Sequence, residues 1–154
     1  MTSSIIRPTQ DQDIGPLQDV LDRTQLFPSE MLPDMLAPAL AGTSNDNWLS
    51  CLSQGVVVGF CFAAAEPLTE GTWNMRAIAV RPDCQGQKLG AALVAALEDH
   101  LRSTGQRLVV VDTSGTDAFE ATRAFYDANN YHQTACIPGF WGPGDDKVIF
   151  TKAL

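Results

Sequence analysis

Apolar and polar positions alternate along the chain with two different periods. Leucines recur at every fourth residue from Leu89 to Leu101, and Gly105 follows them, which predicts an amphipathic helix that ends near this glycine. Apolar residues dominate 56–65 and 108–111, a pattern typical of strands covered on both faces of a sheet. No apolar run reaches the length of about 20 residues that a membrane-spanning helix needs.

Weaker patterns complete the order of elements. The chain opens with a short strand at Ile5 and Ile6, followed by a helix that Asp11 is expected to cap. Two prolines at 33 and 38 are expected to break or bend a second helix and to leave it irregular and movable. Asp117 and Glu120 resemble a capping box. We expect further strands at 47–52, 73–80, 131–137 and 148–152, and further helices at 11–21, 29–40 and 117–128. The order β-α-α-β-β-β-α-β-α-β-β, without repeat or linker, predicts one α/β domain over 1–154.

Composition and charge exclude several classes of protein. The chain has 154 residues, 45% of them hydrophobic, so it is a globular domain rather than a disordered segment. A net charge of −8 disfavours general binding to nucleic acid. Four cysteines without a C-x-x-C pair, and two histidines, predict no metal site and free thiols in the cytoplasm. Arg7 interrupts the first apolar residues, so we expect no secretory signal.

The segment 77–90 carries the clearest chemical pattern. A strand leads into a short loop, and the loop leads directly into a helix, whose first N–H groups have no partner within the helix. Gly86 and Gly90 let an anion approach the backbone, and Arg81 and Lys88 flank the loop. A plain strand-to-helix turn is the alternative. The glycine patterns of dinucleotide and nucleoside triphosphate sites are absent.

This segment resembles the acyl-CoA loop of the GCN5-related N-acetyltransferases, the GNAT family. The family signature is Arg or Gln, two free positions, Gly, a free position, and Gly or Ala; here it reads Gln-Gly-Gln-Lys-Leu-Gly over 85–90, with Lys88 at the usual glycine. Phe125 and Tyr126, with Tyr131 after them, are similar to a second family motif, in which Asn130 replaces a glycine. The resemblance covers nearly the whole chain and implies a mixed, mostly antiparallel sheet with helices on both faces.

The resemblance implies acetyl-CoA as the co-substrate and assigns positions to it. The strand before the loop is expected to separate from its neighbour and to pair with the pantetheine arm, and the loop amides are expected to hold the pyrophosphate. The strand positions are Ile78, Ala79 and Val80, and the loop positions are Gln85, Gly86, Gln87, Lys88, Leu89, Gly90 and Ala91. Lys88 keeps such contacts if it is helical rather than at positive φ. Its ammonium either pairs with a phosphate or is solvated.

The resemblance also makes Tyr126 the acid that protonates the departing CoA thiolate, a role that suits a phenol. The alternative is an aromatic residue that packs its helix against the sheet. Phe119 stands where many members have an asparagine that contacts CoA, so that contact is expected to be absent or made differently. Asn74 stands where histone-type members have a glutamate base, and an amide cannot accept the proton. The base is Glu66, Glu70, Asp112 or a chain of water molecules.

The acceptor site is expected between the stretch 27–40 and the loop 140–146. Phe140 and Trp141 can wall a pocket and the aspartates of the loop can attract an amine; alternatively this loop is a hairpin turn and the aromatic residues cover the sheet edge. We therefore expect direct acetyl transfer to a small-molecule or peptide amine, without an acyl-enzyme. A non-catalytic acyl-CoA-binding regulatory module is the alternative. Neither nucleic acid nor membrane is an expected partner, and the oligomeric state, including a homodimer, is left open.

Overall fold

The computed structural model describes residues 4–154, so the first three residues of the segment that argued against a secretory signal lie outside it. The observed order of elements is the predicted one. The strands are β1 (Ser4–Pro8), β2 (Asn47–Ser53), β3 (Val56–Ala65), β4 (Thr72–Val80), β5 (Leu108–Ser114), β6 (His132–Gly142) and β7 (Asp145–Ala153). The helices are α1 (Ile14–Thr24), α2 (Leu32–Leu40), α3 (Leu89–Ser103) and α4 (Glu120–Ala128), with short 3₁₀ turns before each of them.

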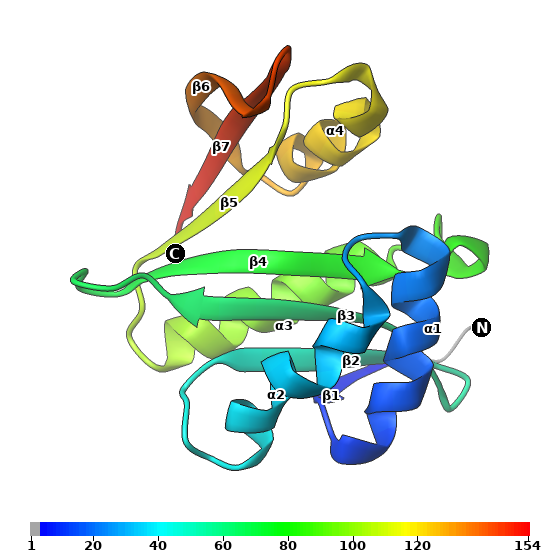
Figure 1. Ribbon diagram of the computed structural model, residues 1–154. Coiled ribbons are helices and arrows are strands. Elements are labelled where there is room, and N and C mark those ends of the chain that lie inside the picture. The colour runs from blue at the N-terminus through cyan, green and yellow to red at the C-terminus, as the bar shows by residue number, and fades with distance from the viewer. Residues whose placement is uncertain (1–3) are drawn as a thin grey trace.

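All seven strands belong to one sheet in the order β1-β2-β3-β4-β5-β7-β6. Every pair is antiparallel except β4 with β5. These two strands pair only where Thr72, Trp73 and Asn74 face 108–110, and beyond Asn74 they separate. β5, β6, β7 and α4 thus form a C-terminal lobe that stands away from the main lobe, as Figure 1 shows. The separation occurs on the strand where the resemblance implied it.

Two hydrophobic clusters cover the two faces of the sheet. One lies between the sheet and helices α3 and α4, and includes the four leucines at positions 89, 93, 97 and 101. The other lies under α1 and α2 and includes Leu17, Leu21 and Leu36. β3 contributes to both clusters, which explains why its side chains are buried on both faces from Val57 to Ala64. The prediction of helices on both faces is confirmed.

β5 differs from its prediction. Val109 and Val111 are buried, whereas Leu108, Val110 and Asp112 are only partly covered, so the strand alternates instead of being buried on both faces. The reason is its place in the sheet: β4 accompanies only its first three residues, and α1 and α2 cover the other lobe. The partly covered face of β5 therefore opens onto the gap between the lobes.

Three local predictions about helices also need correction. The prolines do not break α2, which follows a 3₁₀ turn at 29–31 and runs from Leu32 to Leu40: its first proline lies in the first turn, where no N–H is needed, and Pro38 lies inside it. That this segment is movable stays a prediction. Asp117 and Glu120 form no capping box, because a 3₁₀ turn occupies 117–119 and the α-helix begins at Glu120. The cap near α1 is made by the Asp13 carboxylate, which accepts the N–H of Gln10. None of the helices within 4–154 has both the length and the apolar character needed to cross a membrane.

Candidate functional site

The end of β4, the loop with the first turn of α3, and helix α4 line an open cavity of about 490 Å³. Nine of the residues expected to bind the co-substrate or to act on it line this cavity: Ile78, Val80, Gln85, Gly86, Lys88, Leu89, Gly90, Ala91 and Tyr126. Ala79 and Gln87 do not. The Ala79 side chain lies in the core under α1 and α2, and the Gln87 side chain is exposed on the loop. The structure thus brings the loop, the end of β4 and Tyr126 to one hollow.

Five further residues line the cavity that the sequence did not indicate as site residues: Cys84, Ala121, Thr122, Phe125 and Asn129. Four of them belong to α4 or its end, on the face that also carries Tyr126. The spacing of residues three and four apart on a helix was the available signal. Extending that spacing from Tyr126 in both directions would have found Thr122 and Asn129, and steps of four back from Asn129 reach Phe125 and Ala121.

The loop and the first turn of α3 present a row of free amides. The first hydrogen bond of α3 runs from the Ala92 N–H to the Lys88 carbonyl, so the N–H groups of 89–91 have no partner in the helix. Within the described residues, the N–H groups of 86–88 have no protein acceptor either. The Gln85 amide is engaged by the Pro82 carbonyl at 3.3 Å, and its side-chain amide donates to the Val80 carbonyl at 3.0 Å. Gln85 therefore anchors the loop to the end of β4, and 86–91 supply the free donors.

Lys88 does not have the helical conformation under which it was expected to keep its contacts with the pyrophosphate. Its φ is 63° and its ψ is 21°, so it is left-handed, not helical, and it caps α3. The N–H of Lys88 nevertheless has no backbone acceptor within 4–154, so the left-handed conformation leaves this donor free, at a cost in strain. The other flanking cation is differently placed: Arg81 is paired with Asp83 at 2.6 Å, which raises the pKa of Arg81 and lowers that of Asp83. Lys88 is the cation of the loop that has no protein partner in the described chain.

The two loop positions Gly86 and Gly90 require glycine for different physical reasons. Gly86 has a φ of +81°, a conformation that glycine adopts without strain. Gly90 is helical, and a Cβ placed on it would lie 3.3 Å from ring atoms of Phe125. Gly90 therefore lets α3 approach α4 closely, and the distance between these helices sets the width of the cavity.

Tyr126 is packed in the core, as one interpretation of the sequence expected, and its role as an acid stays a prediction. The residue is only 5% exposed, and its ring packs near those of Phe125, Tyr131 and Phe150. Burial raises the pKa of its phenol, so the hydroxyl keeps its proton at neutral and moderately alkaline pH. Tyr126 also lines the cavity. It is thus a packed aromatic residue on the wall of the cavity, while Phe119 is exposed and does not line it.

Asn74 lies where β4 and β5 begin to separate, and its side chain is hydrogen-bonded to two carboxylates. Its side-chain amide donates to Glu66 Oε1 at 3.0 Å and to Asp112 Oδ2 at 3.3 Å. Lys147 Nζ lies 3.7 Å from the same Asp112 oxygen. Glu70 is not part of this group; it is exposed in the β3–β4 turn, where its carbonyl accepts from Arg107 at 2.7 Å. Two of the three candidate bases therefore meet at the vertex of the opening.

No group of three or more His, Cys, Asp or Glu side chains within 4–154 is arranged to hold a metal ion.

The two aspartates of the β6–β7 hairpin form hydrogen bonds with other residues of the protein. Asp145 accepts from the Ser114 hydroxyl at 2.5 Å, and Asp146 accepts the Gly139 N–H at 2.9 Å. The strands run further than predicted, so that only Pro143 and Gly144 form the turn. Phe140 and Trp141 are about half exposed. The Trp141 indole donates to the Thr113 carbonyl at 3.2 Å, which folds its side chain back towards the end of β5.

Comparison with known proteins agrees with this geometry. Residues 17–131 match the model of the acetyltransferase (GNAT) family. A comparison with curated protein sequences finds no match.

Solved structures share the fold along their whole length. A GNAT-family protein from Desulfovibrio desulfuricans superposes with a TM-score of 0.89 at 28% identity, over 98% of this chain and 99% of that one. An aminoglycoside 6'-N-acetyltransferase in complex with coenzyme A has a TM-score of 0.78 at 20% identity, over 97% and 96% of the two chains. The Escherichia coli ribosomal-protein-S18-alanine N-acetyltransferase has a TM-score of 0.78 at 18% identity, over 98% and 94%. The family match over most of the chain, together with the shared fold, shows that this chain belongs to the GNAT family of acetyltransferases.

Proposed function

We propose that this chain transfers the acetyl group of acetyl-CoA directly to a primary amine. The observation that carries the proposal is one cavity lined both by the loop with its free amides and by a protonated, buried tyrosine. Two proteins of the same fold support the choice of co-substrate: one from Salmonella typhimurium was solved with its cofactor acetyl-CoA, and the aminoglycoside acetyltransferase with coenzyme A.

The proposed binding mode follows from the free hydrogen-bonding groups. The amides of 86–91 would hold the pyrophosphate at the positive end of the α3 dipole, with the Lys88 ammonium beside it. From Met75 to Val80, the edge of β4 that faces β5 has no partner strand, and the pantetheine arm would pair with the backbone there. This arrangement would direct the acetyl end along β4 towards the vertex at Asn74.

The residues around the reacting atoms then have separate tasks. Tyr126 would donate its proton to the thiolate that leaves: its position on the cavity supports this role, and its raised pKa keeps the proton on the hydroxyl but makes the phenol a weaker acid than a solvated one. At the vertex, Lys147 already pairs with Asp112, so Glu66 is the carboxylate of the group without a cation. Glu66 would attract the ammonium of the acceptor and take up its proton, either directly or through water. Asn74 would hold both carboxylates in place.

Calorimetry and an amine screen test this proposal together. We expect acetyl-CoA to bind the wild type in the micromolar range, about −8 kcal/mol, and to bind Gly86→Pro much more weakly, because proline removes one N–H and cannot adopt a positive φ. We expect thiol release that depends on the amine. No binding by the wild type, or undiminished binding by the proline variant, contradicts the cofactor site. Binding without amine-dependent thiol release across the panel favours the acyl-CoA-binding regulatory module instead.

A further inference from the structure

Two basic residues of this acidic chain have no protein partner in the part of the chain that the structure describes. The chain holds 10 Lys and Arg residues against 18 Asp and Glu residues. Within 4–154, eight of the basic side chains bind a carboxylate or a backbone carbonyl: Arg7, Arg23, Arg81, Arg102, Arg107, Arg123, Lys147 and Lys152. Lys88 and Arg76 are the remaining two, and Lys88 belongs to the loop described above. Arg76 thus has a guanidinium without a partner in a protein rich in carboxylates.

A bulge in β4 places this arginine. Phe62 pairs with Ala77 and Ala63 pairs with Met75, so Arg76 is the extra residue between them. Trp73 and Met75 lie in the core under α3, so alternation turns Asn74 to the opposite face, and after the bulge Ala77 and Ala79 lie in the core under α1 and α2. Arg76 is exposed, and because α3 covers the face that carries Trp73, Met75 and Val80, its side chain lies on the face away from α3.

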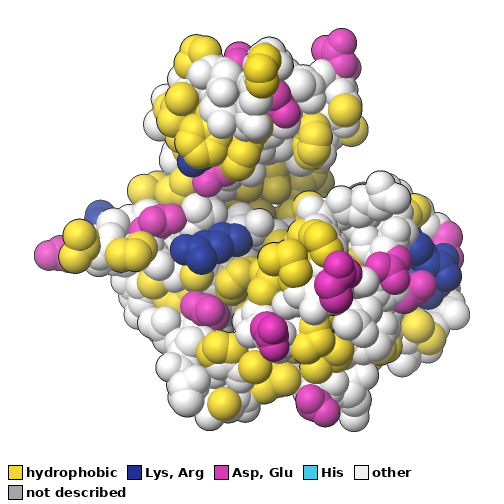
Figure 2. Space-filling model, viewed as in Figure 1, with side chains coloured by type: hydrophobic (Ala, Val, Ile, Leu, Met, Phe, Trp, Pro, Cys, Tyr) yellow, Lys and Arg dark blue, Asp and Glu magenta, His cyan; other side chains and the backbone are white. Residues whose placement is uncertain are grey.

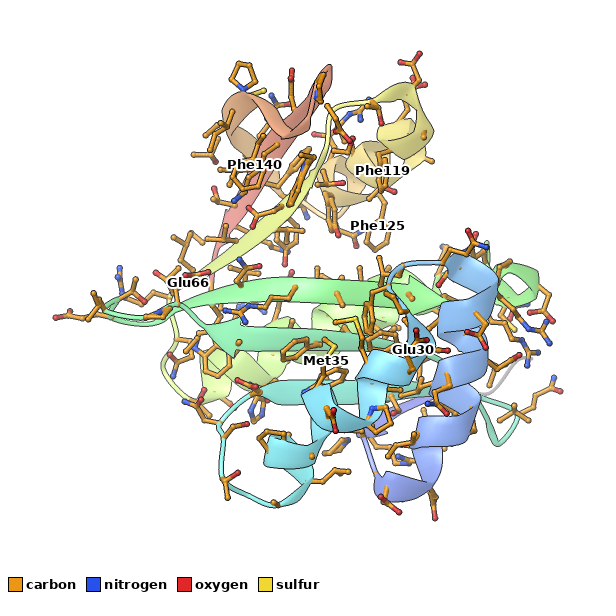
Figure 3. The ribbon with its side chains drawn as sticks, viewed as in Figure 1. Glu30, Met35, Glu66, Phe119, Phe125 and Phe140 are labelled. Carbon is orange, nitrogen blue, oxygen red and sulfur yellow. The ribbon has the colours of Figure 1, made fainter. Side chains whose placement is uncertain are left out.

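This face of β4 is the floor of the open space between the lobes. Figure 2 shows the hollow between the lobes, with a Lys or Arg side chain on its floor. β4 contains one basic residue, Arg76, and this residue is exposed. Figure 3 shows what surrounds the hollow: Phe140 belongs to the C-terminal lobe above it, Glu66 lies at the end of β3, and Met35 lies on the helical side below. The cation is thus surrounded by the elements expected to form the acceptor site.

We propose that Arg76 binds a carboxylate of the acceptor, so that the substrates of this enzyme are amino-acid-like compounds that carry both an amine and a carboxylate. The inference rests on the proposed acetyl transfer and adds the substrate class to it. The planar guanidinium matches a carboxylate with two parallel hydrogen bonds. Asn74, which gathers Glu66 and Asp112, lies two residues away, about 7 Å along the strand. One small molecule can therefore place its ammonium at the carboxylates and its carboxylate at Arg76.

The position of Arg76 argues against a role in holding the phosphates of CoA. Val80, where β4 ends at the loop, is four residues further on, about 13 Å along the strand. The free amides and Lys88 lie beyond that point. The two unpartnered cations therefore lie at opposite ends of the opening between β4 and β5, and each is suited to a different anion.

The test compares acceptors that differ only in the carboxylate. Amino acids, their amides and the corresponding decarboxylated amines are offered to the wild type, Arg76→Gln and Arg76→Lys, with Arg23→Gln as the control, because Arg23 forms an exposed pair with Asp19 on α1 and its loss changes the net charge equally. We expect the wild type and the control to have a KM about tenfold lower for the acid form, with a similar kcat. Arg76→Gln should lose this preference, and Arg76→Lys should keep part of it.

The outcomes separate this inference from the proposed function. Equal use of acids and amides by the wild type, or an unchanged preference in Arg76→Gln, overturns the role of Arg76 while leaving acetyl transfer intact. A preference for phosphonate analogues over carboxylates, lost in Arg76→Gln, also overturns the carboxylate assignment. Calorimetry of N-acetylated amino acids against the protein saturated with CoA provides a second measurement that does not depend on turnover. Equal binding of these compounds by the wild type and Arg76→Gln overturns the inference as well.

Discussion

Two neighbouring tyrosines show how similar side chains receive different tasks. The rings of Tyr126 and Tyr131 lie 5.9 Å apart, and burial raises the pKa of both. The Tyr131 hydroxyl donates to Glu98 Oε2 at 2.8 Å, and the charge of this carboxylate raises the pKa of Tyr131 further. Tyr126 instead lines the cavity. The pair therefore provides an internal control for the assignment of the acid.

Tyr126→Phe keeps the ring and removes only the hydroxyl. We expect kcat to fall about 10²–10⁴-fold, provided that chemistry limits turnover, while the free energy of unfolding and the affinity for acetyl-CoA change little. Tyr131→Phe should show the reverse pattern: kcat is retained and stability falls by about 2 kcal/mol, because a hydrogen bond to a buried carboxylate is lost. Steady-state kinetics and urea melts of both variants distinguish a catalytic role of Tyr126 from a packing role. Full kcat in Tyr126→Phe would end its assignment as the acid.

Lys88 combines an unfavourable backbone conformation with a free charge, and two substitutions separate them. Lys88→Gly relieves the strain of φ 63° and should raise the free energy of unfolding by about 1 kcal/mol; Lys88→Ala keeps the strain. Both remove the ammonium, so both should weaken acetyl-CoA binding several-fold, and the difference from the wild type should shrink at high salt. Wild-type affinity in both variants would show that this side chain is solvated.

At the scale of elements, a buried ion pair joins β1 to α1. Asp13 is 1% exposed; it receives two hydrogen bonds from Arg7, at 2.7 and 2.9 Å, one from the Ser50 hydroxyl at 2.9 Å and one from the Gln10 N–H at 2.8 Å. Burial alone would raise the pKa of this carboxyl, but the hydrogen bonds from Arg7, Gln10 and Ser50 together with the charge of Arg7 lower it. The group thus fixes the start of α1 against β1 and β2.

The stability that Asp13 contributes depends on pH in a definite direction. Because its pKa is lower in the folded than in the unfolded protein, the contribution is present above the unfolded pKa near 4 and is lost as the pH falls through the folded value. At pH 7, Asp13→Asn should cost about 3 kcal/mol of unfolding free energy, and this difference should shrink in strongly acidic solution. Urea melts at several pH values measure it. Asp19→Asn, which breaks an exposed pair, is the control, and an equally small effect of both variants would contradict the account.

The elements also show which features a sequence can predict. β3 and α3 follow from composition and period alone, because both faces of β3 and one face of α3 are apolar. β5 has a similar apolar run but a different environment, and only the separation from β4 after Asn74 explains it. Likewise, the approach of Glu66 and Asp112 to Asn74 joins residues 8 and 38 positions apart. Such contacts depend on the register of the strands, which the local pattern does not contain.

On the scale of the whole molecule, one buried carboxylate connects the two lobes. Glu98 of α3 accepts from Tyr131 beyond α4 and from Lys152 of β7, the latter at 2.8 Å. Lys152 also donates to the carbonyl of Asn129 at 3.0 Å. This connection lies on the side of the C-terminal lobe that carries Tyr126. It fixes the position of α4, and hence the cavity, relative to α3.

Glu98→Gln tests this connection. The variant leaves the Lys152 ammonium without its buried carboxylate partner, and we expect a loss of about 2 kcal/mol in unfolding free energy. Because the relative position of the lobes sets the width of the cavity, the affinity for acetyl-CoA should fall together with the stability. Asp99→Asn, which affects an exposed pair on the same helix, is the matched control and should change neither quantity. Unchanged affinity in a destabilised Glu98→Gln would show that the cavity does not depend on this contact.

Direct acetyl transfer to an amine fixes the ratio of two products, and both can be measured in one reaction. The purified protein is mixed with acetyl-CoA and the best amine of the panel, and released thiol and N-acetylated amine are measured in the same sample. We predict that the two products form in equal amounts, that both require the amine, and that Gly86→Pro, which disrupts the loop, abolishes both. Thiol release without acetylated amine, or equal activity in the proline variant, would contradict the account.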